Sequence, residues 1–286
     1  MAEILNGTAA ASALTQRLRQ ETDELRARGV VPCIALLRAG DAEADVMYER
    51  MVERRCASAG IAVRHCTFPA TVTTAELIDE IVLLNADAGV HGVLLFRPLP
   101  GHIDDEAVRR ALRPEKDVDG VSDLSLAAIC TGSGAGYPPC TAAACVELLH
   151  HYGVALSGKR AVVIGRSLVI GKPVALMLLS EDATVTVCHS KTRELDAVCR
   201  EADIIITAAG KAGLIGARHV RPGQVLLDVG VSVDAQGCVL GDVELDEAEP
   251  VVAAMSLPKG GIGPVTTAVL ARHVVEAAKK TVKDEE

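Results

Sequence analysis

Aromatic residues are nearly absent from this chain of 286 residues: they make up 2% of it, and tryptophan does not occur. The core must therefore be packed with valine, leucine, isoleucine and alanine, an aliphatic bias that fits buried parallel strands covered by helices. Hydrophobic residues make up 49% and charged residues 23%, the balance of a globular protein. The length suits two domains of about 100–200 residues each.

Long runs of one residue kind are missing as well. The net charge is −9 and no long basic run occurs, which argues against nucleic acid or an anionic membrane as a partner. No apolar run approaches the roughly 20 residues of a membrane helix. The segment Met1 to Leu5 carries Glu3 and lacks a basic leader followed by an apolar stretch. We therefore expect a cytoplasmic protein without a secretory signal.

The cysteines form no C-x-x-C pair, which argues against a metal centre or a disulfide framework and favours reduced, mostly buried thiols. They occupy positions 33, 56, 66, 130, 140, 145, 188, 199 and 238.

Short apolar runs alternate with helical patterns along the chain, which is typical of βαβ units and predicts an α/β fold. The predicted strands cover residues 31–37, 62–68, 92–96, 161–164, 184–188, 204–208 and 225–229. The predicted helices cover residues 45–60, 74–87, 141–151, 173–179 and 266–280.

A loop-like segment from Gly132 to Pro139 separates the two halves of the chain. We predict one domain over residues 1–145 and a second, of Rossmann type, over residues 146–265. The C-terminal segment 266–286 is expected to return and pack on the first domain.

The segment Gly165-Arg166-Ser167-Leu168-Val169-Ile170-Gly171-Lys172-Pro173 follows an apolar strand and opens a helix. Small residues there let the backbone approach a pyrophosphate, whose charge the helix N-terminus favours. Ser167 replaces the middle glycine of the usual G-x-G-x-x-G pattern, and Gly171 comes one residue later than the last glycine. The pattern predicts a dinucleotide site; a tight strand-to-helix turn without a ligand is the alternative.

The end of the next strand indicates which dinucleotide binds. NAD-binding units usually have an acid there, which holds the ribose 2′-hydroxyl. This strand ends instead in His189-Ser190-Lys191-Thr192. Together with Arg166, these donors and positive charges suit a 2′-phosphate and predict NADP, with NAD as the less favoured cofactor.

A series of short motifs follows in a fixed order along the chain. They are Gly92-Val93-Leu94-Leu95 with Pro98-Leu99-Pro100, Lys116-Asp117-Val118-Asp119-Gly120, Pro139-Cys140-Thr141, Val163–Pro173, Cys188-His189-Ser190-Lys191-Thr192, Gly210-Lys211, Asp228-Val229-Gly230, Gly241-Asp242-Val243 and Gly260–Thr266. In these motifs and their spacing the chain resembles, over nearly its whole length, the methylenetetrahydrofolate dehydrogenase/cyclohydrolase family.

The resemblance implies an N-terminal three-layer α/β folate-binding domain, a Rossmann-type NAD(P)-binding domain with a cleft between them, and usually a homodimer. It implies hydride transfer from the bridging methylene of 5,10-methylenetetrahydrofolate to the nicotinamide, which gives methenyltetrahydrofolate. In bifunctional members the same site hydrolyses the methenyl form to 10-formyltetrahydrofolate.

The resemblance also implies roles for individual residues. As catalytic residues, Tyr48 matches the helix tyrosine beside the folate and Asp119 matches the acid that hydrogen-bonds the pterin. The substrate is expected on Tyr48, Phe96, Pro98, Asp119, Lys259 and Gly261. The cofactor is expected on Gly165, Arg166, Ser167, Gly171, His189, Ser190, Val231 and Thr266. No metal is implied.

The chain departs from the family's helix motif Ser-x-x-Tyr-x-x-x-Lys. Asp45 stands at the serine position and Val52 at the lysine position. The family's lysine serves proton transfer in the cyclohydrolase step, and valine has neither a titratable proton nor a donor. Phe96 replaces the glutamine that orients this lysine. We expect Val52 and Phe96 to form an apolar wall.

Two other cations could substitute for the lost lysine. Lys259 stands where the family usually has proline, and it either returns a cation to the cleft or is a solvated loop lysine. Arg55 lies on the same helical stripe as Tyr48 and is otherwise a surface residue.

Three hypotheses therefore stand. The first is an NADP-dependent methylenetetrahydrofolate dehydrogenase with weak or absent cyclohydrolase activity, because hydride transfer needs chiefly the orientation of two bound partners. The second keeps both activities, with Lys259 or an ordered water in place of the lysine. The third is a non-catalytic dinucleotide-binding regulatory protein.

Overall fold

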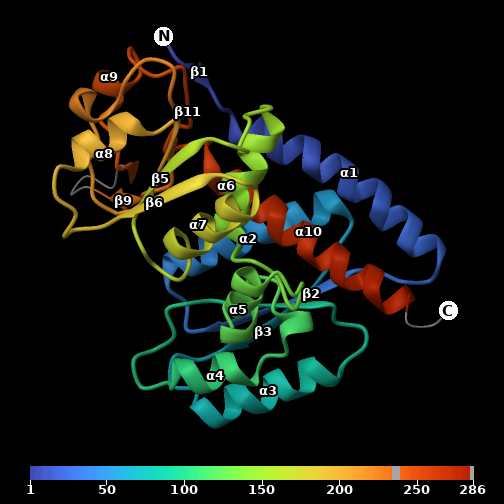
Figure 1. The fold of residues 1–286 in the computed structure, drawn as a ribbon. Helices are drawn as coiled ribbons and strands as arrows, with labels where there is room; N and C mark the ends of the chain where they lie inside the picture. The colour runs from blue at the N-terminus through green and yellow to red at the C-terminus, as the bar shows by residue number, and fades with distance from the viewer. Residues whose placement is uncertain (234–238, 284–286) are drawn as a thin grey trace. The chain divides into compact units, whose positions relative to one another are not determined.

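The computed structural model describes residues 1–233 and 239–283, and it divides into two compact units (Figure 1). The six-stranded unit comprises residues 1–11 and 141–266, and the three-stranded unit comprises residues 12–140 and 267–286. Helices α1 (Gly7–Ala27) and α10 (Ile262–Lys283) each contribute residues to both units. Cys238 lies outside the described residues.

The three-stranded unit is built on a parallel sheet in the order β3-β2-β4. Its strands are β2 (Cys33–Ala39), β3 (Ala62–Phe68) and β4 (Gly92–Leu95). Its further helices are α2 (Glu43–Ala59), α3 (Thr74–Ala86), α4 (Asp105–Ala111), the 3-10 turn η1 (Pro114–Lys116) and α5 (Asp123–Thr131).

Alternate residues of this sheet form one core with α3 and α4, which lie along the same face of it (Figure 1). Ala35 and Leu37 of β2 point to that face, as do Val93 and Leu95 of β4. From α3, from α4 and from the residue that follows α4 come side chains at intervals of three and four, as an amphipathic helix requires: Leu77, Ile81, Leu84, Val108 and Leu112.

The six-stranded unit has a wholly parallel sheet in the order β1-β11-β8-β7-β5-β6. Its strands are β1 (Glu3–Ile4), β5 (Arg160–Ile164), β6 (Thr184–Cys188), β7 (Ile204–Thr207), β8 (Val225–Asp228) and β11 (Ala254–Met255). An antiparallel pair, β9 (Ser232–Val233) and β10 (Val239–Leu240), is separate from this sheet. Its other helices are α6 (Cys140–His151), α7 (Gly171–Ser180), α8 (Leu195–Glu201), the 3-10 turn η2 (Ala217–His219) and α9 (Leu245–Ala248).

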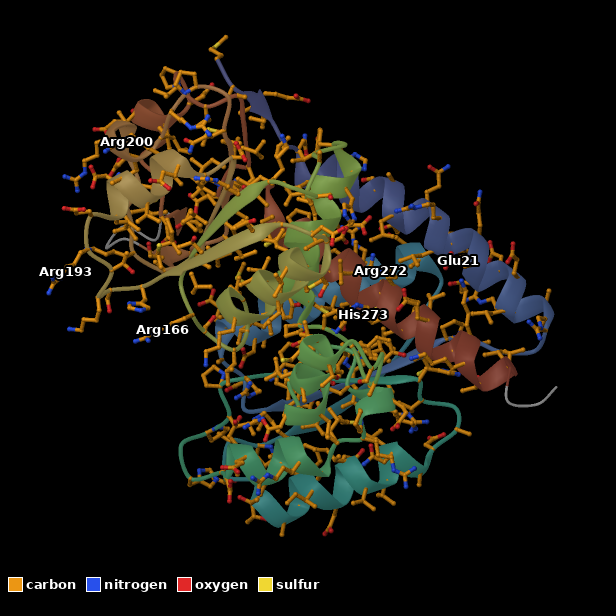
Figure 2. The ribbon with its side chains drawn as sticks, in the orientation of Figure 1. Glu21, Arg166, Arg193, Arg200, Arg272 and His273 are labelled. Atoms are coloured by element: carbon orange, nitrogen blue, oxygen red, sulfur yellow. The ribbon has the colours of Figure 1, made fainter. Side chains whose placement is uncertain are left out.

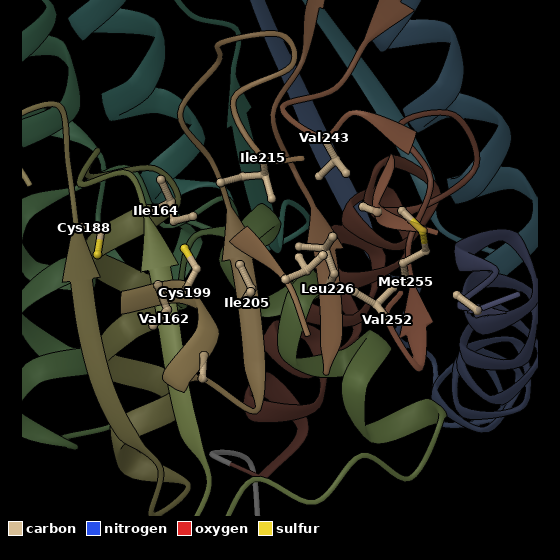
Figure 3. Close-up of a cluster of buried hydrophobic side chains, with 14 residues drawn as sticks. Val162, Ile164, Cys188, Cys199, Ile205, Ile215, Leu226, Val243, Val252 and Met255 are labelled. Carbon is tan, nitrogen blue, oxygen red and sulfur yellow. The ribbon is translucent and has the colours of Figure 1, made fainter. Parts of the chain in front are cut away.

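Figure 3 shows the aliphatic core of the six-stranded unit, in which buried side chains project from adjacent strands. Val162 and Ile164 of β5 lie beside Ile205 of β7 and Leu226 of β8, and Met255 comes from β11. The near absence of aromatic residues is thus met by aliphatic packing, as the composition predicts.

Most predicted elements agree with the structure within a few residues. The predicted strands 62–68 and 184–188 coincide with β3 and β6, and Gly60 ends α2 in the left-handed conformation. The predicted ranges include neither α1 nor β1, but the turn residues Asn6-Gly7-Thr8 predict a strand-to-helix turn, and the chain passes from β1 to α1 there. Because β1 pairs with β11, residues 1–11 belong to the six-stranded unit, although the predicted first domain includes them. Among the described residues, no helix has both the length and the apolar character needed to cross a bilayer.

The segment 116–122 of the three-stranded unit is shaped by one buried carboxylate. Asp117 is fully buried and accepts hydrogen bonds from the N–H groups of Val121 (2.9 Å) and Ser122 (2.8 Å). The hydroxyl of Ser125 donates a third bond at 2.6 Å. A buried carboxylate is stable in this form because its charge is compensated by several donors.

The residues on either side of Asp117, Lys116 and Val118, are also fixed by contacts with neighbouring elements. The Nζ atom of Lys116 donates to the carbonyls of Leu84 (2.6 Å) and Asp87 (2.5 Å) at the end of α3, where a cation is favoured. The side chain of Val118 packs on Gly92 so closely that a Cβ atom there would lie 2.5 Å from a Val118 methyl carbon. The start of β4 therefore fixes this segment.

We expect Gly92→Ala to destabilise the protein by about 1–3 kcal/mol, because the added methyl group must displace the Val118 side chain. Urea denaturation would measure the free energy of unfolding. Gly101→Ala is the matched control, since no atom lies within 4 Å of its added Cβ atom. The double change Gly92→Ala/Val118→Ala should be less than additive, and strict additivity would contradict the contact.

Candidate functional site

The predicted dinucleotide loop connects β5 to α7. Gly165 has φ +127°, and a side chain there would collide with the carbonyl of Ala208. A side chain on Gly171, the first residue of α7, would collide with the Gly165 carbonyl. The hydroxyl of Ser167 closes the turn by accepting from the N–H groups of Ile170 (3.1 Å) and Gly171 (3.5 Å). The loop can thus bring its backbone to an anionic pyrophosphate at the N-terminus of α7.

Exposed donors follow the neighbouring strand β6. The His189 N–H donates to the Thr192 hydroxyl at 2.9 Å, and the Lys191 N–H donates to Nδ1 of His189 at 3.2 Å. This turn leaves Ser190 and Lys191 exposed. Arg166, after β5, is also exposed, and so is Arg193, further along the loop after β6 (Figure 2). The donor set fits a phosphate group at this edge of the sheet.

A second buried carboxylate, which sequence reasoning missed, shapes the loop after β7. Asp242 accepts hydrogen bonds from the Thr207 hydroxyl (2.5 Å) and from the N–H groups of Ala209 and Lys211 (2.6 Å each). A Cβ atom on Gly230 would collide with this carboxylate. The glycine and aspartate motifs at 228–230 and 241–243 thus support the segment 209–211.

Asp228 supports Asp242 in turn. Its carboxylate accepts from the N–H groups of Asp242 (3.0 Å) and Val243 (3.2 Å). Burial raises the pKa of Asp228 to about 6, although these N–H groups oppose the shift. The signal that could have found the pair is the occurrence of an aspartate within two residues of a glycine in both motifs.

The other predicted residues of the six-stranded unit differ in exposure. Val231 and Lys259 are exposed, and Thr266 is buried on α10 with its hydroxyl bonded to a carbonyl one turn earlier (3.2 Å). Gly261 is buried against the start of α1, where a side chain on Gly7 would meet its carbonyl.

In the three-stranded unit, Tyr48 of α2 and Phe96 after β4 form an edge-to-face pair. Their ring centroids lie 6.0 Å apart and their planes meet at 70°. Phe96 is 5% exposed and Val52, one turn after Tyr48, is 1% exposed, so both predicted apolar positions are buried. Pro98 is exposed. Burial, and then the nearby Asp119 carboxylate, raise the pKa of Tyr48 well above its usual value, so its phenol stays protonated.

Asp119 is the one acid of the segment 116–122 whose carboxylate no backbone N–H fixes in the described structure, and its residue is half-buried. Burial raises its pKa to about 7, the Cys140 thiol lowers it by hydrogen bonding, and Asp117 raises it. A carboxyl group that titrates near neutrality beside the Tyr48 phenol can accept hydrogen bonds from a ligand or exchange a proton with it.

Arg55, the other candidate cation of α2, connects helices within the three-stranded unit. Its Nη1 atom donates to the Thr15 hydroxyl at 2.7 Å and its Nε atom to the Thr267 hydroxyl at 3.3 Å. These bonds link α2 to α1 and α10, which identifies Arg55 as a packing residue.

One group among the described residues has the spacing of metal ligands: Glu49, Glu53 and His65. Nδ1 of His65 lies 3.0 Å from Glu49 and Nε2 lies 3.2 Å from Glu53, so the two ring nitrogens face different carboxylates. Glu49 is also paired with Nε of Arg38 at 2.8 Å. In the described structure this cluster is a hydrogen-bonded network, because the two ring nitrogens of His65 face different carboxylates and Arg38 already bonds the buried Glu49.

The two parts of the chain match the two parts of one known family. Residues 5–119 match the tetrahydrofolate dehydrogenase/cyclohydrolase catalytic domain, and residues 139–282 match the NAD(P)-binding domain of the same family. A bifunctional protein FolD from Alkaliphilus oremlandii is 39% identical over 279 residues, which are 98% of each chain.

Solved structures agree with this match. The bifunctional enzyme FolD from Campylobacter jejuni has a TM-score of 0.95 and 34% identity, covering 98% of this chain and 100% of that chain. The methylenetetrahydrofolate dehydrogenase-cyclohydrolase of Trypanosoma brucei, complexed with NADP and an inhibitor, has a TM-score of 0.92 and 33% identity over 99% of both chains. Since relatives of this identity align along nearly its full length, the chain belongs to the tetrahydrofolate dehydrogenase/cyclohydrolase family.

Proposed function

We propose that the protein is an NADP-dependent dehydrogenase that oxidises 5,10-methylenetetrahydrofolate to the methenyl form, with weak or absent cyclohydrolase activity. The observation that carries the proposal is the pairing of Phe96 with Tyr48 beside a buried Val52. The family's catalytic lysine and its glutamine partner would stand at these two apolar positions. Tyr48 and Asp119, which match the folate-binding residues, are retained.

The groups of this chain suit hydride transfer better than hydrolysis. The Asp119 carboxylate would hydrogen-bond the pterin, and the neutral phenol of Tyr48 would lie beside the folate. Bound NADP supplies the hydride acceptor. Hydride transfer asks the protein mainly for orientation. Hydrolysis needs a proton donor or base, and the aromatic ring of Phe96 and the aliphatic side chain of Val52 have none.

The preference for NADP rests on the edge formed by Arg166, Ser190 and Lys191. A 2′-phosphate would receive charge-assisted hydrogen bonds there, whereas the ribose of NAD would find no acid at the end of β6. Gly165, Ser167 and Gly171 would hold the pyrophosphate. We assign His189, Val231 and Thr266 to the cofactor, and Pro98, Lys259 and Gly261 to the substrate, from the family positions alone.

The proposal includes a homodimer and a cytoplasmic location. The family resemblance supports the homodimer. The free thiols support a reducing compartment, because none of the described cysteines is in a disulfide.

The purified protein should reduce NADP with 5,10-methylenetetrahydrofolate, and methenyltetrahydrofolate should accumulate. Added methenyltetrahydrofolate should disappear at the rate of buffer alone, because no proton-transfer group replaces the lysine. Absorbance of the methenyl form measures both reactions. Enzymatic hydrolysis above the buffer rate would contradict the proposal, and its loss in Lys259→Ala would identify the substitute. Reduction of neither NADP nor NAD would favour a binding protein.

Restoring the lysine should restore hydrolysis only together with its partner. We expect Val52→Lys alone to be poorly active and less stable, because a buried lysine beside Phe96 lacks a hydrogen-bonding partner. Val52→Lys/Phe96→Gln should hydrolyse methenyltetrahydrofolate up to about a hundredfold faster than Val52→Lys, within the range of a positioned acid–base group. Met51→Lys, at an exposed neighbouring position, is the control for added charge. Equal rates for the single and double variants would argue against the pairing.

Arg166→Ala should raise the KM for NADP by about tenfold or more, the equivalent of one charge-assisted hydrogen bond, and leave the KM for NAD nearly unchanged. Steady-state kinetics with both cofactors would measure the ratio. Arg160→Ala is the control, since Arg160 is an exposed arginine at the opposite end of β5. A parallel rise in both KM values would show that Arg166 does not recognise the 2′-phosphate.

A further inference from the structure

The carbonyl of Val118, the residue before Asp119, is held by two buried side chains from distant parts of the chain. Nδ1 of His273, on α10, lies 2.8 Å from the carbonyl oxygen, and Sγ of Cys140, the first residue of α6, lies 3.2 Å from it. The two side chains also approach each other, with Sγ and Nδ1 3.6 Å apart. His273 is 2% exposed and Cys140 is 1% exposed. All four residues belong to the three-stranded unit, and Figure 2 labels His273 on α10.

The protonation states follow from burial and from the acceptor. Burial lowers the pKa of His273 to about 3, so the ring is neutral at physiological pH. Since Nδ1 faces a carbonyl oxygen, the ring proton must be on Nδ1, and His273 donates to Val118. Burial raises the pKa of Cys140 well above its usual value, so its sulfur keeps its proton. Both contacts are therefore donations from uncharged groups.

The thiol and the imidazole act on the same acceptor. Cys140 donates to the Val118 carbonyl at 3.2 Å and His273 at 2.8 Å, so two donors from different helices hold the orientation of the Val118–Asp119 peptide. The thiol also lowers the pKa of the Asp119 carboxyl against the effect of burial.

Neighbouring contacts fix Gly120 and the His273 ring. Gly120 approaches the backbone of Tyr137 so closely that a side chain there would lie 2.5 Å from the Tyr137 carbonyl oxygen. The Tyr137 ring stacks on His273 with centroids 5.0 Å apart, and Nζ of Lys280 lies 4.6 Å from the centre of that ring. The imidazole of His273 thus has its ring plane fixed by Tyr137 and its proton directed at Val118.

From these contacts we infer that His273 and Cys140 are positioning residues for the folate site: both donate to the Val118 carbonyl and so orient the Val118–Asp119 peptide. The inference rests on the proposed role of Asp119 in holding the pterin. Neither residue needs to touch the substrate. A rotation of the Val118–Asp119 peptide would redirect the Cα–Cβ bond of Asp119. The carboxylate would then no longer face two adjacent donors of a ligand, and the ligand would bind more weakly.

The first test compares His273→Ala with His273→Asn in the full-length protein. His273→Ala should raise the KM for 5,10-methylenetetrahydrofolate about tenfold, with the KM for NADP unchanged. His273→Asn should recover most of the affinity, because the amide nitrogen of asparagine can take the place of Nδ1. Val275→Ala, on the same helix and equally buried, controls for lost packing.

If His273→Ala and Val275→Ala reduce stability alike and neither changes the folate KM, His273 is only a core residue and the inference fails. An inactive wild-type protein would instead refute the proposed function. Should His273→Ala not fold, the ratio of KM values between His273→Asn and the wild type still decides, since an increase of about tenfold in the asparagine variant would contradict the role assigned to Nδ1.

The second test uses Cys140. Cys140→Ala removes one of the two donors to the Val118 carbonyl, so the KM for 5,10-methylenetetrahydrofolate should rise several-fold while the KM for NADP is unchanged. Cys140→Ser keeps a donor at this position and should recover most of the affinity. An unchanged folate KM in Cys140→Ala would refute the role of the thiol.

Discussion

In each unit, one loop takes its shape around a fully buried carboxylate. Asp117 accepts hydrogen bonds from two backbone N–H groups and a serine hydroxyl, and Asp242 accepts them from two backbone N–H groups and a threonine hydroxyl. A buried charge without such donors would cost several kcal/mol, so each loop has one conformation in which the charge is tolerated. The carboxylates therefore specify loop geometry more than they add stability.

This arrangement separates the residues that build a site from those that act in it. In the segment 116–120, Lys116 is bonded to the end of α3, Asp117 to its own turn, and Val118 to β4 and to His273. The Asp119 carboxylate, the proposed ligand group, has no such backbone bond in the described structure. The same division holds after β5, where Ser167 closes the turn while Arg166 extends into solvent.

Local signals allowed much of the fold to be predicted from the sequence. The strands β3 and β6 are bounded by turns and alternate or run apolar, and Gly60 ends α2 because glycine accepts a positive φ without strain. The loop at Gly165 was predictable because one of its close approaches, that of Gly171 to the Gly165 carbonyl, arises within a single strand-to-helix turn. Each of these patterns spans only a few consecutive residues, so it can be recognised in a single sequence.

The missed features depend on residues far apart in the sequence. His273 sits in the apolar pattern of α10, and only the fold shows that its ring reaches Val118. Asp242 likewise bonds Thr207, on a strand 35 residues earlier. The strand β1 has two residues, too few for any periodicity, and its partner β11 is just as short.

The pairing of β1 with β11 also constrains the order in which the molecule can form. A ribosome completes Glu3 and Ile4 long before their partners Ala254 and Met255, which lie about 250 residues further along the chain. The edge strand β1 therefore cannot pair with β11 until much later in synthesis. Closing the long loop between the two strands is entropically costly and slow. Until then the side chains of Ala2 and Leu5, which are buried in the folded protein, stay exposed to solvent. The amino-terminal segment is therefore accessible to chaperones during translation.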